Sequence, residues 1–212
     1  MDCVRSRLPQ AQRRTQLVSA ALDIAIAEGI AATTIRRVAK RAGVALGVVH
    51  YCFADKDDLF VALAERIVTD LLGAASDAPG FDDAEDLAVA LRCAVDGLWE
   101  GIEATRAAQL LTYEITAHAL RNPALNHVAE RQYAVSRAAV SALLSSAATS
   151  TRSAWLRPVD EVADEVLAML DGITLRWLVD GDGVAARARL ARFTDYVRTY
   201  AKTTRRRRKG SA

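Results

Sequence analysis

The chain has 212 residues, of which 51% are hydrophobic, so it is long enough for one sizeable domain or for a small domain joined to a larger one. The formal net charge of +2 hides an asymmetry, because residues 1–56 carry net +5, residues 57–204 carry net −8 and the run 205–209 adds +5. No stretch is apolar over the roughly 18–20 residues that span a bilayer, no secretory signal opens the chain, and three widely spaced cysteines do not suggest a disulfide framework, so we expect a cytoplasmic protein without a membrane segment.

The first predicted helix covers residues 10–28, where apolar residues recur at i, i+3, i+4 and i+7. Gly29 follows it, in the position where a glycine commonly ends a helix. A second helix is predicted over residues 34–41, and the side chain of Thr33 or Thr34 is suited to cap its first turn.

Gly43 separates the second helix from a short third helix, predicted over residues 45–52, because glycine permits the positive φ that a sharp turn needs. A longer fourth helix is predicted over residues 56–74. Asp55 is its candidate N-cap, since an aspartate in that position accepts a hydrogen bond from a free amide of the first turn.

The clearest break in the helical pattern is the segment "SDAPGFDD" at residues 76–83. Asp82 and Glu85 have the spacing of a capping box, which predicts that the next helix begins there. Helical patterning then continues to Asn122, with a bend expected near Gly101.

Further helical segments fill the rest of the chain. One is predicted over residues 124–148 and is followed by a loop of Ser, Thr and Ala. Pro158 suits the first turn of the next helix, which runs to about Asp180. The turn "DGDG" then leads into a last helix that ends near Lys202. Because no alternating pattern of the strand type persists, the predicted fold class is all-α.

Residues 34–52 have the physical parts of a helix-turn-helix. Ala39 is small where two helices must approach closely, and Gly43 permits the turn between them. The apolar residues that can share a core with the first helix are Ile35, Val38, Val44 and Val49. The side chains left facing outward are those of Arg36, Arg37, Lys40, Leu46, Val48 and His50. Such a second helix is short enough to lie in a DNA major groove, roughly 12 Å wide, and the basic front end suits a polyanion.

Residues 33–60, "TTIRRVAKRAGVALGVVHYCFADKDDLF", resemble the DNA-binding domain of the tetracycline-repressor (TetR) family. The match rests on the preceding helix with its glycine and on Gly43, Val44, Gly47, Phe53, Lys56 and Leu59. Two positions depart from the family pattern. Ala45 replaces the usual serine, and His50 stands where a phosphate-contacting tyrosine is usual, with Tyr51 beside it.

The resemblance implies that a double-stranded DNA operator is the partner of this segment. Arg36 would reach a phosphate or a base edge, and residues 45–48 would form the recognition surface. His50, Tyr51 and Lys56 would hold the DNA backbone. The complete predicted DNA-binding set is Thr34, Arg36, Ala45, Leu46, Gly47, Val48, His50, Tyr51 and Lys56. Each cation could instead be a solvated surface charge, and Tyr51 could instead belong to the core.

The resemblance further implies a C-terminal helical bundle that binds a small-molecule effector and forms a homodimer. The predicted domains are a helix-turn-helix DNA-binding domain at residues 1–56, an effector-binding and dimerisation domain at residues 57–202, and a basic disordered tail at residues 203–212. The tail could add sequence-independent phosphate contacts, or it could simply keep the chain soluble.

Apolar stripes on the last two helices are the candidates for the dimer interface, because two such helices from each of two chains form a four-helix bundle. The predicted interface residues are Val162, Val166, Met169, Leu170, Ile173, Leu190, Phe193 and Val197. The alternative is that these side chains pack against the core of their own chain.

A ligand pocket needs apolar walls and a few convergent polar groups. The candidates for the effector pocket are Trp99, Glu103, Tyr113, Glu114, His118, Tyr133 and Trp177, although each could also be ordinary core or surface. No carboxylate pair, Ser/His/Asp set, phosphate-binding glycine loop or Cys/His cluster suggests catalysis, a metal or a cofactor. Cys52 could serve as a redox switch, or it could be a buried and inert thiol.

The sequence therefore predicts a ligand-responsive transcriptional regulator, a repressor that a small molecule releases from its operator. Two alternatives stay open. An activator or a DNA-binding protein without effector control predicts no effect of a ligand on operator affinity. A helical enzyme or carrier with a basic hairpin predicts no binding to duplex DNA.

Overall fold

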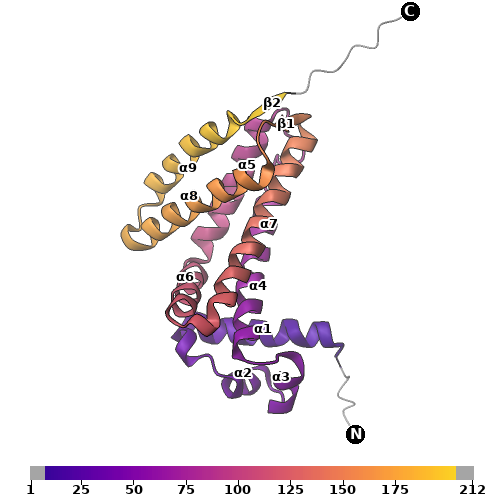
Figure 1. The fold of residues 1–212 in the computed structure, drawn as a ribbon, viewed down its shortest axis with the longest axis vertical. Helices are drawn as coiled ribbons and strands as arrows, with labels where there is room; N and C mark the ends of the chain where they lie inside the picture. The colour runs from indigo at the N-terminus through magenta and orange to yellow at the C-terminus, as the bar shows by residue number, and fades with distance from the viewer. Residues whose placement is uncertain (1–7, 204–212) are drawn as a thin grey trace, which may run out of the picture. The chain divides into compact units, whose positions relative to one another are not determined.

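The computed structural model describes residues 8–203, and most of them lie in α-helices (Figure 1). The chain divides into two compact units, which we call the head unit (Met1–Ile67 with Ala107–Gln132) and the body unit (Val68–Arg106 with Tyr133–Ala212). The predicted all-α fold class is confirmed. The predicted basic run at residues 205–209 lies outside the described part of the chain. No helix within residues 8–203 is long and apolar enough to cross a membrane.

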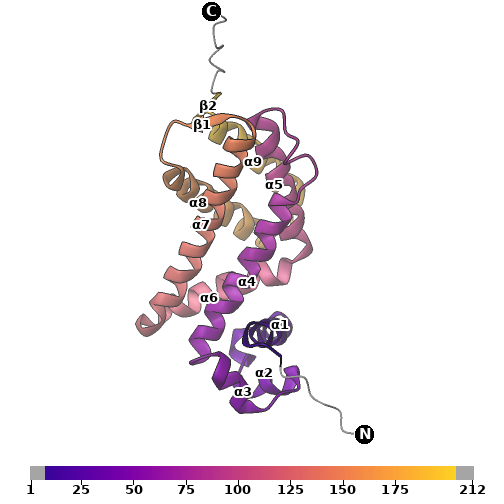
Figure 2. The same ribbon diagram turned by 90° about the vertical axis from the view of Figure 1, so that its right-hand side faces the viewer.

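The head unit contains three consecutive helices, the start of a fourth, and a later segment of the chain. Its elements are α1 (Gln10–Glu28), the 3-10 turn η1 (Ile30–Ala32), α2 (Ile35–Ala42), α3 (Leu46–Cys52), the first part of α4 (Lys56–Ser76), nearly all of α6 (Arg106–Arg121), the 3-10 turn η2 (Pro123–Leu125) and the start of α7 (Asn126–Ser150). In both views α2 and α3 lie on the same side of α1 (Figures 1 and 2).

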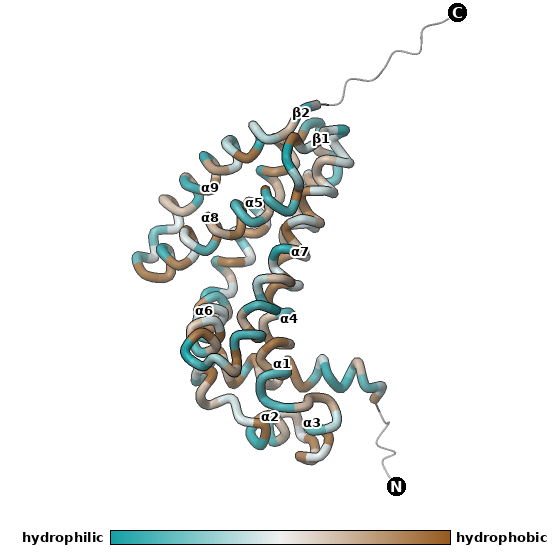
Figure 3. Tube along the Cα trace, viewed as in Figure 1, coloured by the Kyte–Doolittle hydropathy of each residue, from teal (hydrophilic) through white to brown (hydrophobic). Residues whose placement is uncertain are grey.

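The core of the head unit forms because each helix turns an apolar stripe inward. Figure 3 shows hydrophobic and hydrophilic residues alternating along α1, and its buried residues include Leu17, Ala21 and Ile24. Val38 from α2 and Val49 from α3 are fully buried as well. Burying one Val or Leu side chain contributes about 1.5–3 kcal/mol, so these contacts hold the α2–α3 pair firmly against α1.

The caps predicted for the head helices are confirmed. Thr34 accepts a hydrogen bond from the amide of Arg37 at 3.3 Å, so Thr34 rather than Thr33 caps α2. Asp55 accepts a hydrogen bond from the amide of Asp58 at 2.8 Å, at the start of α4. Both helices therefore begin where the sequence places them.

The body unit combines long helices with one small sheet. Its elements are the rest of α4, α5 (Leu87–Ala104), the rest of α7, strand β1 (Ser153–Trp155), α8 (Val159–Asp180), α9 (Gly183–Arg198) and strand β2 (Ala201–Thr203). The two strands pair antiparallel, with Ala154 opposite Lys202. The indole Nε1 of Trp155 donates to the carbonyl of Leu144 at 3.1 Å, which ties the sheet to α7.

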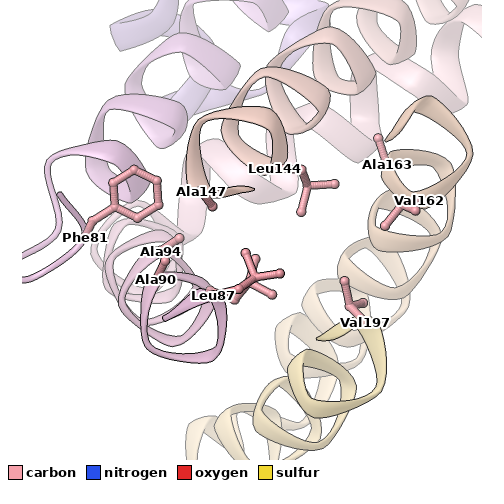
Figure 4. Close-up of a cluster of buried hydrophobic side chains, with 10 residues drawn as sticks. Phe81, Leu87, Ala90, Ala94, Leu144, Ala147, Val162, Ala163 and Val197 are labelled. Atoms are coloured by element: carbon pink, nitrogen blue, oxygen red, sulfur yellow. The ribbon is translucent and has the colours of Figure 1, made fainter. Parts of the chain in front are cut away.

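Apolar side chains from α5, α7, α8 and α9 form one buried cluster in the body unit. Figure 4 shows Leu87, Ala90 and Ala94 from α5, Leu144 and Ala147 from α7, Val162 and Ala163 from α8, Val197 from α9, and Phe81, which precedes α5. Many of these residues are alanines, so the helices approach one another closely where they meet.

The start of α5 differs from the prediction. Asp86 caps α5 by accepting a hydrogen bond from the amide of Val89 at 3.0 Å. The predicted capping box at Asp82 and Glu85 is therefore wrong, and the helix begins one turn later. Several acidic residues precede this helix, and spacing alone does not tell which of them meets a free amide.

Two further predicted boundaries are wrong. The bend expected near Gly101 is a break at Thr105, whose amide donates to the carbonyls of Gly101 and Ile102 before α6 begins. The last helix ends at Arg198 instead of near Lys202, because the chain continues into β2 (Ala201–Thr203). Thr203, the first residue of the predicted tail, therefore belongs to this strand. Strands of three residues are too short for an alternating pattern to appear in the sequence.

A glycine permits close contact between α4 and α5 inside the body unit. A Cβ atom added at Gly97 would lie 2.4 Å from the carbonyl oxygen of Ala74 and 2.7 Å from the Cβ of Ala78. Replacing Gly97 with alanine should therefore lower the free energy of unfolding by about 1–3 kcal/mol, the usual cost of overpacking. Urea denaturation of the purified variant measures this change.

Gly73 provides the matched control, because a Cβ at Gly73 in α4 would meet nothing within 4 Å. Alanine at this position should raise the free energy of unfolding by about 0.5–1 kcal/mol, since it restricts the unfolded chain. A Gly97→Ala protein at least as stable as the parent would contradict the close approach of the two helices.

Candidate functional site

The α2–α3 pair forms a helix-turn-helix with a free outer face. Gly43 has φ 67°, in the left-handed region, which lets the amide of Val44 bond back to the carbonyl of Ala39 at 3.0 Å. The buried residues of α3 are Val49 and Cys52, so the thiol of Cys52 faces the interior. The remaining residues of this short helix are available at the surface of the head unit.

The structure places all nine predicted DNA-binding residues on this part of the head unit. Thr34, Arg36, Ala45, Leu46, Gly47, His50 and Tyr51 are exposed, whereas Val48 and Lys56 are half-buried. The side chain of Tyr51 is 71% exposed, which excludes the alternative that it belongs to the core. Contact between these residues and DNA stays a prediction.

The cations of α2 differ in how they are engaged. Arg37 forms a two-fold ion pair with Glu28, and the hydrogen bonds from Arg37 lower the pKa of that carboxyl group. Arg41 pairs with Asp23 at 2.8 Å. Arg36 and Lys40 are exposed and have no ion-pair partner within residues 8–203. Two of the four cations are therefore free to meet an external anion.

Lys56 lies at the first position of α4, where free amides already favour an anion. Its Nζ atom lies 4.9 Å from the centre of the Phe60 ring. A cation over an aromatic face is attracted by the ring, so the ammonium group is held in place at the surface. The matched family pattern has a lysine at this position, and the stacking on Phe60 gives it a defined orientation.

Arg14 supports α3 and was not predicted from the sequence. Its guanidinium donates to the carbonyl of Cys52 at 2.7 Å, pairs with Asp58 at 2.8 Å and stacks on Phe53 at 4.2 Å. The hydrogen bond from Arg14 is the main reason why the pKa of Asp58 is lowered. One side chain of α1 thus fixes both the end of α3 and the start of α4. No short-range signal could reveal it, because its partners are about forty residues away in the chain.

The seven predicted effector residues divide between the two units. Tyr113, Glu114 and His118 lie on α6 in the head unit. Glu114 accepts a hydrogen bond from the amide of Ile30 at 3.5 Å, and the His118 ring meets the Phe60 ring edge-on at 6.2 Å. His118 is exposed and Glu114 is half-buried, so both side chains contact their own unit near its surface. Neither unit by itself contains all seven residues.

The other predicted effector residues lie in the body unit. Trp99 and Trp177 contact each other edge to face at 5.4 Å. Glu103 pairs with Arg187 at 2.5 Å. The indole N–H of Trp99 is buried without a hydrogen-bond partner within residues 8–203. The two tryptophan rings thus contact each other, whereas Glu103 forms a partly exposed ion pair with Arg187.

Tyr133 lies apart from this group. Its hydroxyl donates to Asp171 at 2.7 Å. Burial, followed by the bond to this carboxylate and its charge, raises the pKa of Tyr133 to about 12. The phenol is therefore protonated throughout the physiological range, and whether it contacts an effector stays a prediction.

A cavity of about 60 Å³ lies between α5, α7, α8 and α9 in the body unit. A single water molecule needs about 10–15 Å³ by this kind of measure, so the cavity holds several groups of that size. Its lining residues are Leu91, Ala94, Val95, Leu98, Val140, Leu143, Leu144, Val166, Leu170, Leu190, Phe193, Thr194 and Val197. The predicted effector residues are absent from this lining.

The predicted dimer residues lie mainly inside the body unit. Val166, Leu170, Leu190, Phe193 and Val197 line the cavity. Val162 and Ile173 are buried in the core. These positions favour the alternative of packing against their own chain. Met169 is 40% exposed and is the predicted residue with most surface to offer a partner.

A different apolar face is exposed on α8 and α9. Val179 and Val184 are 79% and 82% exposed, and Leu175 is also exposed. Small residues accompany them on the outer side of the two helices, namely Ala168, Gly172, Ala188 and Ala191. Contiguous exposed apolar residues of this kind mark interaction surfaces. Helical spacing could have revealed this second stripe, but the inner stripe of larger side chains dominates the pattern.

Two protein-family models match the chain. The model described as "Bacterial regulatory proteins, tetR family" matches residues 17–63, and the model described as "BetI-type transcriptional repressor, C-terminal" matches residues 101–202. The first match takes in α2, α3 and the start of α4, and so covers the exposed surface described above.

Individual proteins are similar over most of the chain. The nicotine-responsive transcriptional repressor HdnoR of Paenarthrobacter nicotinovorans is 27% identical, over 82% of this chain and 88% of its own. The structure of a TetR-family member from Streptomyces coelicolor is 31% identical, over 85% of this chain and 97% of its own, with a TM-score of 0.62. The multidrug binding protein EbrR, solved with imidazole, is 32% identical, over 85% and 93%, with a TM-score of 0.61.

Proposed function

The chain belongs to the TetR family of bacterial transcriptional regulators, and on that premise we propose that it represses transcription as a homodimer which a small molecule releases from its operator. The family is one of regulators and not of enzymes. Such a protein acts where bacterial DNA is, in the cytoplasm. The observation that carries the proposal is the free outer face of α3 beside the unpaired cation of Arg36.

The face of α3 suits close approach to DNA. Leu46, Gly47 and Val48 are small or apolar, so they can reach the methyl groups of thymine and the wall of the major groove without burying a charge. Arg36 and Lys56 lie on either side of this face in the chain and would hold phosphates, as would the exposed phenol of Tyr51. Base readout and phosphate binding are thus assigned to different residues.

Two heads are needed to read an operator with two half-sites. In a symmetric dimer the two α3 helices would enter successive major grooves about 34–36 Å apart. We assign the dimer contact to the exposed face of α8 and α9, around Leu175, Val179 and Val184. A face of small residues lets helices of two chains pack closely.

Ligand control is supported by the relatives. HdnoR is named as nicotine-responsive, and EbrR was solved with imidazole and with proflavin. In this chain α4 begins in the head unit at Lys56, which stacks on Phe60 one turn later, and its last turn packs on α5 at Gly97 in the body unit. A ligand that changes the packing of the body unit would act on the head through this continuous helix. By linkage, the ligand and the operator then weaken each other by the same factor.

Selection from a random duplex pool tests the proposal directly. The purified protein should enrich a near-palindromic sequence with half-sites one helical turn apart. Failure to enrich any sequence at modest ionic strength would contradict the proposed function. Repeating the selection with candidate ligands identifies an effector by the loss of enrichment.

Replacing Leu46 with alanine should change the base preferred at one position of each half-site. One contacted base pair is worth about 1–3 kcal/mol, so the preference there should fall by roughly fivefold or more. The same selection measures this effect. Ile26, an exposed apolar residue of α1, provides the control, since its replacement by alanine should leave the selected sequence unchanged. Identical results for both variants would remove Leu46 from base readout.

A further inference from the structure

The cavity of the body unit has walls of one chemical kind. Twelve of its thirteen lining residues are Leu, Val, Ala or Phe, and the other is Thr194. The lining contains no charged residue, and Phe193 is its one aromatic ring. An apolar cavity of this kind does not hold water well, and its walls lose dispersion contacts while it is empty. A hydrocarbon group that enters would restore those contacts.

The hydroxyl of Thr194 is the single polar side-chain group of the lining, and its one donor is already used. The hydroxyl of Thr194 donates its proton to the carbonyl of Leu190 at 2.9 Å, and the residue is 6% exposed. Its oxygen retains lone pairs and can accept one hydrogen bond. The cavity therefore offers a bound molecule no hydrogen-bond donor and one acceptor.

Ions do not suit these walls. A cation would give up its hydration shell with no carboxylate in the lining and without the several aromatic rings of a cation cage. An anion would find no donor. Burying an ion without a partner is far more costly than burying a neutral group.

We propose that this cavity binds an uncharged, largely hydrocarbon molecule that donates at most one hydrogen bond, to the oxygen of Thr194, and that this molecule is the effector. The second half of the inference rests on the proposed function, whereas the first half depends only on the cavity. The cavity of about 60 Å³ has space for roughly four to six water-sized groups at about 10–15 Å³ each, which suits a short hydrocarbon chain whose bonded carbons lie closer together than water molecules.

A series of three probes with the same hydrocarbon body tests the chemical class. Calorimetric titration of the full-length protein would compare 1-hexanol, hexanoate and hexyltrimethylammonium. 1-Hexanol should bind at least about a hundredfold more tightly than either ion, because of the cost of burying a charge, and with a negative heat-capacity change. Equal or tighter binding of either ion would overturn the inference.

Substitutions in the cavity lining test whether the ligand binds in this cavity. Val140→Phe fills the cavity from α7 and should weaken 1-hexanol binding by about tenfold or more, as expected when a ligand-sized space is lost. Ala138→Phe adds the same ring at an exposed position of α7 and should change nothing. Equal affinities for both variants would show that the alcohol binds elsewhere and would overturn the site.

Thr194→Val tests the hydrogen bond without relying on an enlarged side chain. It should weaken 1-hexanol binding by about fivefold, the typical effect of one lost hydrogen bond, and leave the binding of pentyl methyl ether, which has no donor, unchanged. A variant that loses both ligands equally would contradict the role of the hydroxyl.

Operator binding separates this inference from the proposed function. If 1-hexanol binds and lowers operator affinity in a fluorescence-anisotropy titration, both are supported. If it binds but operator affinity stays the same, the cavity keeps its ligand class and the effector assignment is overturned. If the protein binds no operator at all, the proposed function fails while the calorimetric result still decides the chemistry of the cavity.

Discussion

Replacing Val179 with aspartate should separate the dimer into monomers and weaken operator binding by about 10²–10⁴-fold. In our proposal the 79% exposed side chain of Val179 lies in the contact between two chains. A two-fold interface repeats every residue, so one substitution brings two carboxylates into an apolar contact. Burying unpaired charges is costly, and the dimer should dissociate.

The effect on DNA follows from the loss of linkage between the two heads. In a dimer, the second head binds at the high effective concentration set by the first, whereas a monomer meets each half-site separately. Sedimentation velocity measures the assembly state, and fluorescence anisotropy with the selected operator measures affinity. Circular dichroism checks that the variant keeps its helices.

Ala138→Asp is the matched control, because it adds the same charge at an exposed position of α7. It should leave both assembly and operator affinity unchanged. A folded Val179→Asp protein that is still dimeric and binds the operator normally would show that the exposed face of α8 and α9 is not the interface.

Replacing Arg36 with alanine should lower operator affinity by about tenfold or more, since hydrogen bonds to charged groups are among the stronger ones. The guanidinium is exposed and has no ion-pair partner in the described part of the chain, so it is available to a phosphate. Because the proposed contact is to a phosphate, the slope of log affinity against log salt should also fall by about 0.9.

The neighbouring Arg37 provides the matched control for Arg36→Ala. It has the same charge in the same helix, but Glu28 already engages it. Arg37→Ala should therefore leave operator affinity and its salt slope nearly unchanged and slightly reduce stability. Equal losses of affinity from Arg36→Ala and Arg37→Ala would mean that the net charge of the head, and not a specific contact, determines binding.

The head unit could be predicted from the sequence because its signals are local. A cap at Thr34, a left-handed glycine at Gly43 and a cap at Asp55 each act within four residues, and each is present in the structure. The contact between Arg14 and Asp58 could not be predicted. It depends on how α1 crosses the end of α3, which is a property of the packed fold.

The body unit was harder to predict because its helices have two apolar sides. The sequence shows that Leu170 and Val179 both lie on a hydrophobic helix, but the pattern does not say which side meets the same chain. In the structure Leu170 lines the cavity and Val179 is exposed. The seven predicted effector residues divide between the two units, and none of them lines the cavity. Aromatic and charged residues stand out in a sequence, whereas the cavity is lined mainly by leucines and valines, which do not.

The two sides of α8 also bear on how such regulators diversify. Val166 and Leu170 face the cavity, whereas Ala168 and Gly172 are exposed on the outer side. In our proposals, the residues that would determine which molecule is bound are different from the residues of the dimer contact. After gene duplication, one copy could then change its ligand while it still dimerises with the original protein. Heterodimers of the two copies would persist until the outer positions of α8 and α9 diverge as well.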